Sequence, residues 1–426
     1  MIRSTNRVLT AELRNHVGQT VEVSGWLHRR RDLKNVTFLI LRDRAGLAQV
    51  VTSPTGSERY TEESVVTVRG TATANTHAPG GVEITSPEIR VLSAPVAPPP
   101  FDLYRPTVQA GLPTILDNAD VTLRHPLLNA PHRLSAASVA GFRETLSRLG
   151  FTEIHTPKVV SSATESGANV FAIDWFGREA YLAQSPQFFK QAMVGVFERV
   201  FETGPVFRAE PHDTARHLAQ YTSLDAELGF ITDHRDVMAV VREVVAGMAA
   251  AAANGAGEAA ELLEVKFPEV PDEIPEVHFA EAMRMLGADE PDLSPAHERW
   301  LSEWALREYG SEFLFVTGYP MVKRPFYTHP QPDRPEYSNS FDLLFRGLEL
   351  VTGGQRLHRY EDYTAALEQR GEPLEPYQSY LSAFAHGMPP HGGFALGLER
   401  WTTRLTGADN VRRATLFPRD LHRLTP

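Results

Sequence analysis

The sequence predicts an α+β protein with two domains, a small N-terminal domain of strands and a larger domain that mixes strands and helices. The chain has 426 residues, which exceeds the usual size of a single domain. Residues 1–104 read as short strands without a convincing long helix. A proline-rich hinge, Ala94 to Pro100, follows, and amphipathic helical spacing begins only at about residue 131.

The first domain, residues 1–104, is expected to contain five short strands. Each predicted strand is β-branched or alternating, and Gly or Pro clusters separate them. The strands are Thr20 to Leu27, Val36 to Arg42, Leu47 to Thr52, Ser64 to Ala72 and Val82 to Leu92. Five such strands favour a five-stranded oligonucleotide-binding (OB-fold) β-barrel.

Residues 105–130 are expected to form a hinge or linker, and residues 131–426 the second domain. Apolar residues from Leu134 to Leu149 have helical spacing, and Gly150 can end that helix. Further strands are predicted at Phe151 to Thr156, Leu224 to Ile231 and Glu312 to Thr317. Ala246 to Leu263 indicates two helices joined by a turn, and we expect residues 240–290 to form a peripheral helical decoration.

Composition limits the classes of function. No apolar run reaches the ~18 residues of a membrane helix, and the N-terminus lacks an apolar signal core, so a cytoplasmic protein is expected. The chain has no cysteine, which leaves carboxylates and a hard ion such as Mg²⁺ for any metal site. The net charge is −11, but residues 1–104 carry 12 Lys/Arg and 10 Asp/Glu, and include the basic run His28 to Arg31. That run suits a polyanion, although a solvated loop is the ordinary alternative.

Two arginine-containing modules carry the strongest chemical signal. The first combines Phe207 to Glu210, Asp213 to Leu218 and Asp225 to Glu227, and the second is Gly392 to Arg400. Arginine binds phosphate through a planar fork and keeps its charge, so three such cations interleaved with acids suit a triphosphate and its metals. Taken singly, the first is typical of a surface strand and the second of a turn.

Together the modules resemble motifs 2 and 3 of class II aminoacyl-tRNA synthetases. Gln184 to Gln191 resembles the amino-acid segment of aspartyl-tRNA synthetases, and Gly347 to Arg356 resembles their metal and side-chain segment. The helix from residue 131 and the strand after it resemble motif 1, the dimer element, although an ordinary buried helix fits as well. The resemblance runs from about residue 18 to the C-terminus, is closest to the archaeal-type (class IIb) branch, and implies a catalytic antiparallel sheet flanked by helices.

The resemblance implies that ATP is a substrate and assigns residues to it. Arg208 would bridge the amino-acid carboxylate and the α-phosphate, and Arg400 would clamp the γ-phosphate, as the two catalytic residues. Arg216 and His217 would hold the tail of the nucleotide. The remaining residues implied in ATP binding are Glu210, Leu218, Tyr221, Glu349, Gly397, Leu398 and Glu399.

Magnesium would require carboxylates. Glu349 matches the family's metal ligand, and Asp342 lies seven residues before it on a probable strand segment. A structural ion pair is the alternative role for Asp342. Thr352 stands where the family usually has serine, so the hydroxyl is kept and a methyl group is added.

Charge must separate aspartate from the nearly isosteric asparagine. Lys190 and Arg356 match the positions that meet the aspartate side chain, and an amide facing two cations would leave buried donors unpaired. A solvated helix lysine is the ordinary alternative for Lys190. The other residues implied in aspartate binding are Glu165, Ser185, Gln187, Arg208, Asp225 and Thr352. No protein nucleophile is expected, and His391 is expected to be structural.

In the barrel, the resemblance implies anticodon contacts from Arg30, Phe38, Gln49 and Glu83, by stacking and by polar readout of base edges. His28 and Pro79 stand where discriminating relatives tend to have tryptophan and lysine. Proline supplies neither a side-chain donor nor an N–H, so the pair favours relaxed reading of the last anticodon base.

The sequence therefore predicts an aspartate–tRNA ligase, acting as a homodimer on L-aspartate, ATP and tRNA(Asp). It is expected also to charge tRNA(Asn), feeding an amidotransferase that makes Asn-tRNA. The alternatives are a discriminating aspartyl enzyme, an asparaginyl synthetase, a tRNA-independent asparagine synthetase-like paralogue and a non-catalytic tRNA-binding paralogue.

Overall fold

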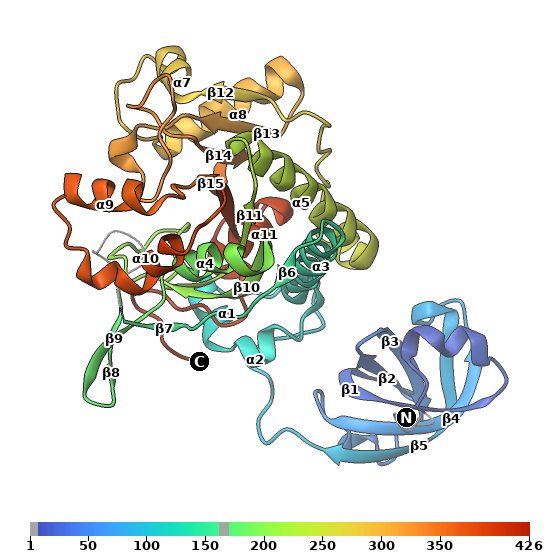
Figure 1. The fold of residues 1–426 in the computed structure, drawn as a ribbon. Coiled ribbons are helices and arrows are strands. Elements are labelled where there is room, and N and C mark those ends of the chain that lie inside the picture. Colours follow the sequence, from blue (N-terminus) through green and yellow to red (C-terminus); the bar gives the residue numbers. More distant parts are fainter. Residues whose placement is uncertain (1–6, 162–169) are drawn as a thin grey trace. The chain divides into compact units, whose positions relative to one another are not determined.

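The computed structural model describes residues 7–161 and 170–426, and the chain divides into two compact units with the boundary between His125 and Pro126. Each unit is described by itself (Figure 1). The segment 105–130, expected to be a linker, holds the short helices α1 (Leu112–Asp117) and α2 (Ala119–Thr122) and the first turn of α3.

The first unit is the predicted closed five-stranded barrel, with strand order β1-β2-β3-β5-β4. Alternating apolar residues fill its interior, and Val23, Leu39, Leu41, Val50 and Val68 are fully buried there. The strands are β1 (Thr20–Asp32), β2 (Thr37–Asp43), β3 (Gly46–Thr52), β4 (Val65–Ala74) and β5 (Val82–Ser93). The OB-type prediction is confirmed.

A bulge interrupts β1. Its pairing with β2 shifts between Leu27 and Arg29, so both Leu27 and His28 are buried instead of alternating. The bulge matters for the role assigned to His28, because it directs that side chain inward.

The second unit is built on an eight-stranded sheet of order β12-β13-β14-β15-β16-β11-β10-β6. Most neighbouring strands are antiparallel, as predicted, but the outermost pairs β12–β13 and β10–β6 are parallel. The strands are β6 (Thr152–Glu153), β10 (Arg199–Phe207), β11 (Gln220–Gly229), β12 (Glu276–His278), β13 (Phe313–Thr317), β14 (Ser340–Phe345), β15 (Leu348–Gln355) and β16 (His391–Gly397). A separate small sheet contains β7 (Val159–Val160), β8 (Ala172–Trp175) and β9 (Arg178–Leu182).

Two strand predictions are corrected in length. The strand expected over residues 151–156 pairs only at Thr152–Glu153. Beyond it, Thr156 donates from its N and Oγ1 to the buried Glu202 carboxylate at 2.9 and 2.7 Å, so a side chain replaces the ladder partner. The strand expected at 224–231 is displaced toward the N-terminus, because β11 starts at Gln220 and ends at Gly229.

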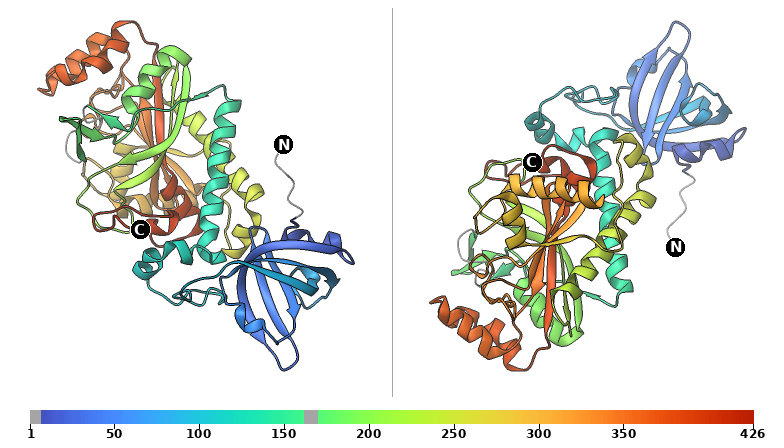
Figure 2. Two further views of the ribbon diagram at one scale, coloured as in Figure 1. Left: turned by 90° about the horizontal axis from the view of Figure 1, so that it is seen from below. Right: turned by 90° about the horizontal axis from the view of Figure 1, so that it is seen from above.

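Helices α3 (Pro126–Arg148) and α5 (His234–Gly255) run side by side along the sheet (Figure 2). Small residues allow the close approach: a Cβ on Gly141 would lie 2.5 Å from the Gly247 carbonyl oxygen. Val237, Val241, Val244 and Val245 of α5 are fully buried in the main core. The expected peripheral position of helices from residue 240 is therefore wrong for α5, because its apolar face covers the sheet.

The remaining helices of the second unit include α9 (Tyr360–Gln369) and α10 (Gln378–Ala385), which share a separate core cluster with Phe326 and Tyr327. The others are α4 (Gln187–Phe197), α6 (Gly257–Leu262), α7 (Phe279–Leu286), α8 (Pro295–Tyr309) and α11 (Leu398–Thr406). Among the helices of residues 7–161 and 170–426, none combines the length and apolar character that a membrane span requires.

Candidate active site

A cavity of about 610 Å³ in the second unit is lined by residues of β11, β15 and β16 and by two loops, residues 208–219 and 322–328. It gathers most of the residues implied in ATP and aspartate binding. The predicted residues in its wall are Gln187, Arg208, Glu210, Arg216, His217, Leu218, Tyr221, Glu349, Thr352, Arg356, Gly397, Glu399 and Arg400.

Strand pairing brings the two arginine modules together. Arg208 follows β10, and its backbone N–H donates to the Ala219 carbonyl at 2.9 Å, which closes the loop between β10 and β11. Arg400 lies in the first turn of α11, directly after β16. Because β16 pairs with β11, Asp225 opposite Ala395, segments far apart in sequence meet at one cavity.

Each of the three arginines has an acidic neighbour. Arg208 lies 3.9 Å from Glu210, Arg216 lies 2.7 Å from Glu298, and Arg400 lies 3.2 Å from the Glu349 carboxylate. All three side chains are partly exposed in the cavity wall. Fixed cations held in place by carboxylates suit a ligand with several negative charges.

Glu298 was missed by sequence analysis. This buried residue of α8 accepts from Arg216 at 2.7 Å and from the Glu349 backbone N–H at 3.1 Å, so it ties two predicted ATP-binding residues together. Burial and the nearby Glu349 carboxylate raise the pKa of Glu298 against the opposing effect of Arg216. The sequence contains no signal for this role, because 82 residues separate Glu298 from Arg216.

The other nucleotide-side predictions lie near the same wall. The Arg208 guanidinium stands 5.6 Å from the centre of the Tyr221 ring. Glu399 accepts from the Thr222 backbone N–H at 3.0 and 3.1 Å, and burial raises the pKa of its carboxyl to about 7. Gly397 is the N-cap of α11, while Leu398 is buried and does not line the cavity.

The predicted metal ligands come from two strands, which corrects the single strand segment expected for Asp342 and Glu349. Asp342 lies on β14 opposite Thr352 on β15, and Glu349 lies at the start of β15 because a tight turn separates the strands. Thr352 Oγ1 donates to Glu349 Oε1 at 3.1 Å. Two carboxylates and a hydroxyl form an all-oxygen donor set, which fits Mg²⁺ in chemistry.

Asp342 also makes an ion pair. Arg324 donates to both oxygens of Asp342 at 3.1 Å, so the structural alternative for this residue is present. Burial and the Glu349 charge raise the pKa of Asp342 to about 6, although Arg324 opposes the shift. Within the described residues, no group of three or more His, Cys, Asp and Glu side chains has the arrangement of a metal site.

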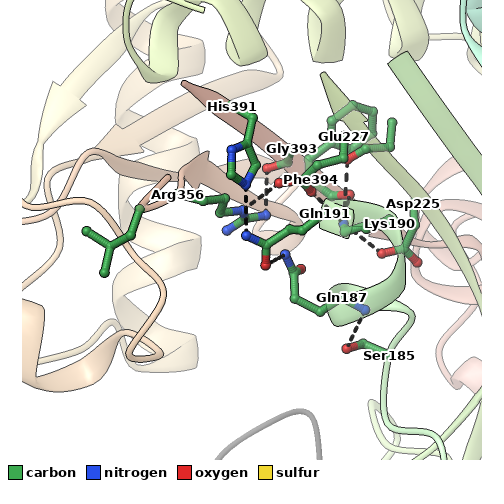
Figure 3. Close-up of polar contacts among 12 residues, drawn as sticks. Ser185, Gln187, Lys190, Gln191, Asp225, Glu227, Arg356, His391, Gly393 and Phe394 are labelled. Carbon is green, nitrogen blue, oxygen red and sulfur yellow. Dashed lines mark hydrogen bonds and ion pairs between the residues drawn. The ribbon is translucent and has the colours of Figure 1, made fainter. Parts of the chain in front are cut away.

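At the cavity wall formed by Arg356, two cations share one buried acid, Glu227 (Figure 3). Lys190 is only 1% exposed and donates to Asp225 Oδ1 and the Phe394 carbonyl, both at 2.9 Å. Glu227 lies 3.3 Å from Lys190 and accepts from Arg356 Nε at 2.9 Å. Burial alone would raise the pKa of Glu227, but Arg356 and Lys190 outweigh it and hold the pKa below its ordinary value.

This arrangement excludes the solvated-lysine alternative for Lys190. Arg356 lines the cavity, whereas Lys190 does not and lies among its protein partners. Glu227 belongs to the first module, but its sequence context predicted no role for it. Its position between two cations was not visible, because Lys190 and Arg356 come from distant segments.

The other aspartate-side predictions lie around these residues. Ser185 Oγ accepts from the Gln187 backbone N–H at 3.3 Å at the start of α4, and Gln187 lines the cavity. Asp225 is buried against Lys190. Glu165 lies outside the described residues.

The paired glycines of the second module lie in strand β16, not in a turn. A Cβ on Gly393 would lie 2.0 Å from Glu227 Oε2 and 2.2 Å from the Ala226 carbonyl oxygen. A glycine is required there because the shared carboxylate occupies the space.

The predicted anticodon residues belong to the first unit. Phe38, Gln49 and Glu83 face outward from β2, β3 and β5, which are neighbours in the barrel. Gln49 Nε2 donates to Glu83 Oε2 at 2.8 Å, and Asn75, which sequence analysis missed, donates to the same oxygen at 2.8 Å. Arg30 is paired with Asp32 at 2.9 Å.

The two residues assigned to tRNA discrimination differ in exposure. His28 is buried and lies 2.7 Å from Arg42 Nη1, and burial, with Arg42, lowers its pKa to about 4. Arg42 in turn makes a two-bond contact with Glu63 at 2.9 Å. Pro79 is partly exposed and opens a short turn in which Gly80 and Gly81 have positive φ. His28 therefore contacts Arg42 within the barrel wall and presents little of its ring to solvent.

Comparison with known proteins is consistent with both units. Residues 112–421 match the family of class II tRNA synthetases (D, K and N), and residues 21–92 match the OB-fold nucleic acid binding domain. An Aspartate--tRNA(Asp/Asn) ligase of Thermus thermophilus is 49% identical, covering 99% of this chain and 100% of the relative. One of the same name from Deinococcus radiodurans is 45% identical, with 100% of both chains covered.

A solved structure is similar over the whole chain. The asparaginyl-tRNA synthetase of Pyrococcus horikoshii complexed with asparaginyl-adenylate has a TM-score of 0.91 and 29% identity, and 100% of each chain is covered. The arginine-lined cavity, the barrel and these matches lead to one conclusion. The chain belongs to the class II tRNA synthetases of the D, K and N group and carries an OB-fold nucleic-acid-binding domain ahead of their catalytic domain.

Proposed function

We propose that this protein is an aspartate–tRNA ligase that activates L-aspartate with ATP and transfers it to the 3′ end of tRNA(Asp) and of tRNA(Asn). The observation that carries the choice of amino acid is the buried set formed by Lys190, Arg356 and Glu227. Lys190 is shared between Asp225 and Glu227, so its charge is compensated within the protein, and Arg356 presents its guanidinium in the cavity wall. A substrate carboxylate can pair with the Arg356 guanidinium, whereas an amide would turn its NH₂ donors toward it.

Activation requires an oxygen of the aspartate α-carboxylate to attack the α-phosphorus of ATP, which forms the aspartyl-adenylate and displaces pyrophosphate. Arg208 contacts both anions and aligns them, and Arg400 and Arg216 hold the outer phosphates, so the protein supplies position and charge compensation. Glu210 and Tyr221 border the adenine side, and His217 holds the tail of the nucleotide with Arg216. Leu218, Gly397 and Glu399 complete this wall, and Leu398 is buried behind it. The acceptor is the 3′-hydroxyl of the tRNA, and no protein nucleophile takes part.

Mg²⁺ is the metal that we assign to the reaction, held by Glu349 and Thr352 with Asp342. When bound, it neutralises charge on the phosphate oxygens. Arg400 pairs with Glu349 at 3.2 Å, so it lies beside the residues that would hold the metal. Arg324 keeps its contact with Asp342 and sets the orientation of that carboxylate.

On the amino-acid side, Ser185, Gln187, Asp225 and Glu165 complete the pocket. We assign residues 1–104 to anticodon binding and residues 131–426 to catalysis. Phe38 stacks on an anticodon base, Gln49 and Glu83 read base edges, and Arg30 contacts the backbone. Pro79 leaves the last anticodon base without a positioned donor, which supports charging of both tRNAs.

The proposal extends to the setting of the enzyme. It acts in the cytoplasm as a homodimer whose contact includes α3 and β6, by their resemblance to motif 1. Aspartate attached to tRNA(Asn) is the substrate of a tRNA-dependent amidotransferase. The names of the Thermus and Deinococcus relatives support the two-tRNA specificity.

Parallel charging of purified tRNA(Asp) and tRNA(Asn) transcripts with labelled aspartate and labelled asparagine tests the proposal. Aspartate on both tRNAs at comparable kcat/KM is the expected result. Aspartate on tRNA(Asp) alone would keep the catalytic assignment and reject relaxed reading at Pro79. Asparagine charging would contradict the role given to Lys190 and Arg356.

A further inference from the structure

A buried chain of hydrogen bonds leads from the cavity into the core, and the function proposed above uses only its first residue. Gln187 lines the cavity and donates through Nε2 to Gln191 Oε1 at 2.9 Å. Gln191 Nε2 lies 2.9 Å from His391 Nε2 and 3.0 Å from the Tyr363 hydroxyl. Figure 3 shows Gln187, Gln191 and His391 in sequence from the start of α4 to β16. Gln191 and His391 are fully buried.

The chemistry of the partners fixes the direction of these bonds. His391 Nδ1 lies 2.9 Å from the Pro389 carbonyl, which can only accept, so Nδ1 carries the proton. Burial lowers the pKa of His391 to about 4, and the neutral ring then offers Nε2 as an acceptor. Gln191 must therefore present its NH₂ group to His391.

Tyr363 and Tyr380 reinforce the same orientation. The Tyr363 hydroxyl donates to the Leu357 carbonyl at 2.6 Å and so accepts from Gln191. The Tyr380 hydroxyl lies 3.0 Å from Gln191 Oε1 and donates to it. A rotated Gln191 amide would turn its oxygen toward the His391 acceptor and its NH₂ toward the Gln187 NH₂, so both contacts would be lost.

The fixed orientation of the Gln191 amide also fixes the orientation of the Gln187 amide, which lines the cavity. Because Gln191 Oε1 accepts from Gln187 Nε2, the NH₂ group of Gln187 is committed on that side. In residues 7–161 and 170–426, no protein donor to Gln187 Oε1 is found, so that oxygen remains an acceptor for a ligand in the cavity. An ammonium group is the matching donor on an amino acid.

We propose that Gln191 and His391 are positioning residues for the amino-acid substrate, which hold the Gln187 amide so that its carbonyl oxygen accepts from the α-ammonium group. The inference rests on the proposed function, since aspartate is the amino acid concerned. Neither residue touches substrate. They affect aspartate binding only through Gln187, which distinguishes a positioning role from a contribution to the stability of the hydrophobic core.

A double-mutant cycle measured by aspartate-dependent ATP–pyrophosphate exchange tests the inference. Gln191→Met and His391→Phe should each raise the KM for aspartate by about tenfold, because one to two oriented hydrogen bonds are lost. The KM for ATP should change by less than about twofold. In a Gln187→Met background, adding Gln191→Met should change the aspartate KM by less than about twofold, since contacting residues are coupled.

Matched controls replace exposed residues of the same type, Gln369→Met at the end of α9 and His386→Phe after α10, and both should leave the KM values unchanged. Full additivity with Gln187→Met, or equal rises of the KM for aspartate and ATP, would overturn the inference. Wild-type exchange without aspartate dependence would instead refute the proposed function, so the two failures are distinguishable.

A second measurement needs no substitution and covers the case in which a core variant does not fold. Nitrogen-15 NMR of histidine-labelled wild-type protein should assign His391 to the neutral form protonated at Nδ1. A ring protonated at Nε2, or a charged ring at neutral pH, would remove the acceptor for Gln191 and overturn the inference.

Discussion

Arg356 donates through Nε to Glu227 Oε1 at 2.9 Å, although the two residues belong to segments separated by strand β16. The same carboxylate lies 3.3 Å from Lys190, so one buried acid holds two cations beside the cavity. Gly393 on the intervening strand leaves the space that the carboxylate occupies. Selection of aspartate in the proposed function depends on this contact.

Replacement of Glu227 by glutamine should leave two buried cations without their shared acid. We expect a loss of about 3–5 kcal/mol in the free energy of unfolding, as for other broken buried ion pairs, measured by urea denaturation. Glu281→Gln is the control, because Glu281 pairs with Arg284 on the surface and should cost less than about 1 kcal/mol. Equal losses in the two variants would contradict the assigned role of Glu227.

Removal of Arg400 should impair the reaction and leave the fold intact. Arg400→Ala is expected to lower kcat/KM for ATP–pyrophosphate exchange by roughly 10²- to 10³-fold, because a charge-compensating donor is lost from the transition state. Arg413→Ala, which removes a cation paired with Asp409 outside the cavity lining, is the control. A fall of less than about threefold for Arg400→Ala would remove it from the catalytic residues.

Glu399 should make stability depend on pH. Burial raises the pKa of Glu399 to about 7 in the folded protein, so the native state holds a proton that the unfolded state has released. Between the ordinary pKa of a glutamate and pH 7, the unfolded state therefore binds fewer protons than the folded state. The contribution of Glu399 to the free energy of unfolding is complete at low pH and is lost as the pH rises through that window. The loss is about 3 kcal/mol at most.

The comparison with Glu399→Gln isolates this effect, because glutamine can accept from the Thr222 N–H but does not titrate. Between pH 5 and pH 8, the Tm measured by thermal unfolding should fall more for the wild type than for the variant. Parallel curves for the two proteins would mean that Glu399 is ionised in the folded state throughout this range.

Phe38 should contribute to tRNA binding without affecting activation. Phe38→Ala is expected to weaken tRNA binding by about 1–3 kcal/mol, the value of one base–aromatic stack, and to leave ATP–pyrophosphate exchange unchanged. Val51→Ala provides a matched control, because Val51 pairs with Phe38 on the neighbouring strand and also faces outward. Equal effects of both variants on the tRNA Kd would indicate barrel destabilisation in place of stacking.

Local sequence patterns were sufficient to predict the elements that depend on short-range physics. The five barrel strands were predicted because apolar residues such as Val23, Leu39 and Val50 alternate, and one face of each strand must be buried. The arginine modules were recognisable because fixed cations beside acids are rare in a core. The position of α5 was mispredicted, because its alanine-rich end gives little indication of what the valine-rich beginning packs against.

The sequence alone determined the fold class, the two modules and the residue types of the catalytic cavity. Only the tertiary structure decided which charges meet: Glu227 with Lys190 and Arg356, Glu298 with Arg216, and His28 with Arg42 inside a bulge. The physical reason is that strand and helix propensities act over a few residues, whereas ion pairs form between side chains that sheet pairing and helix packing bring together from distant parts of the chain.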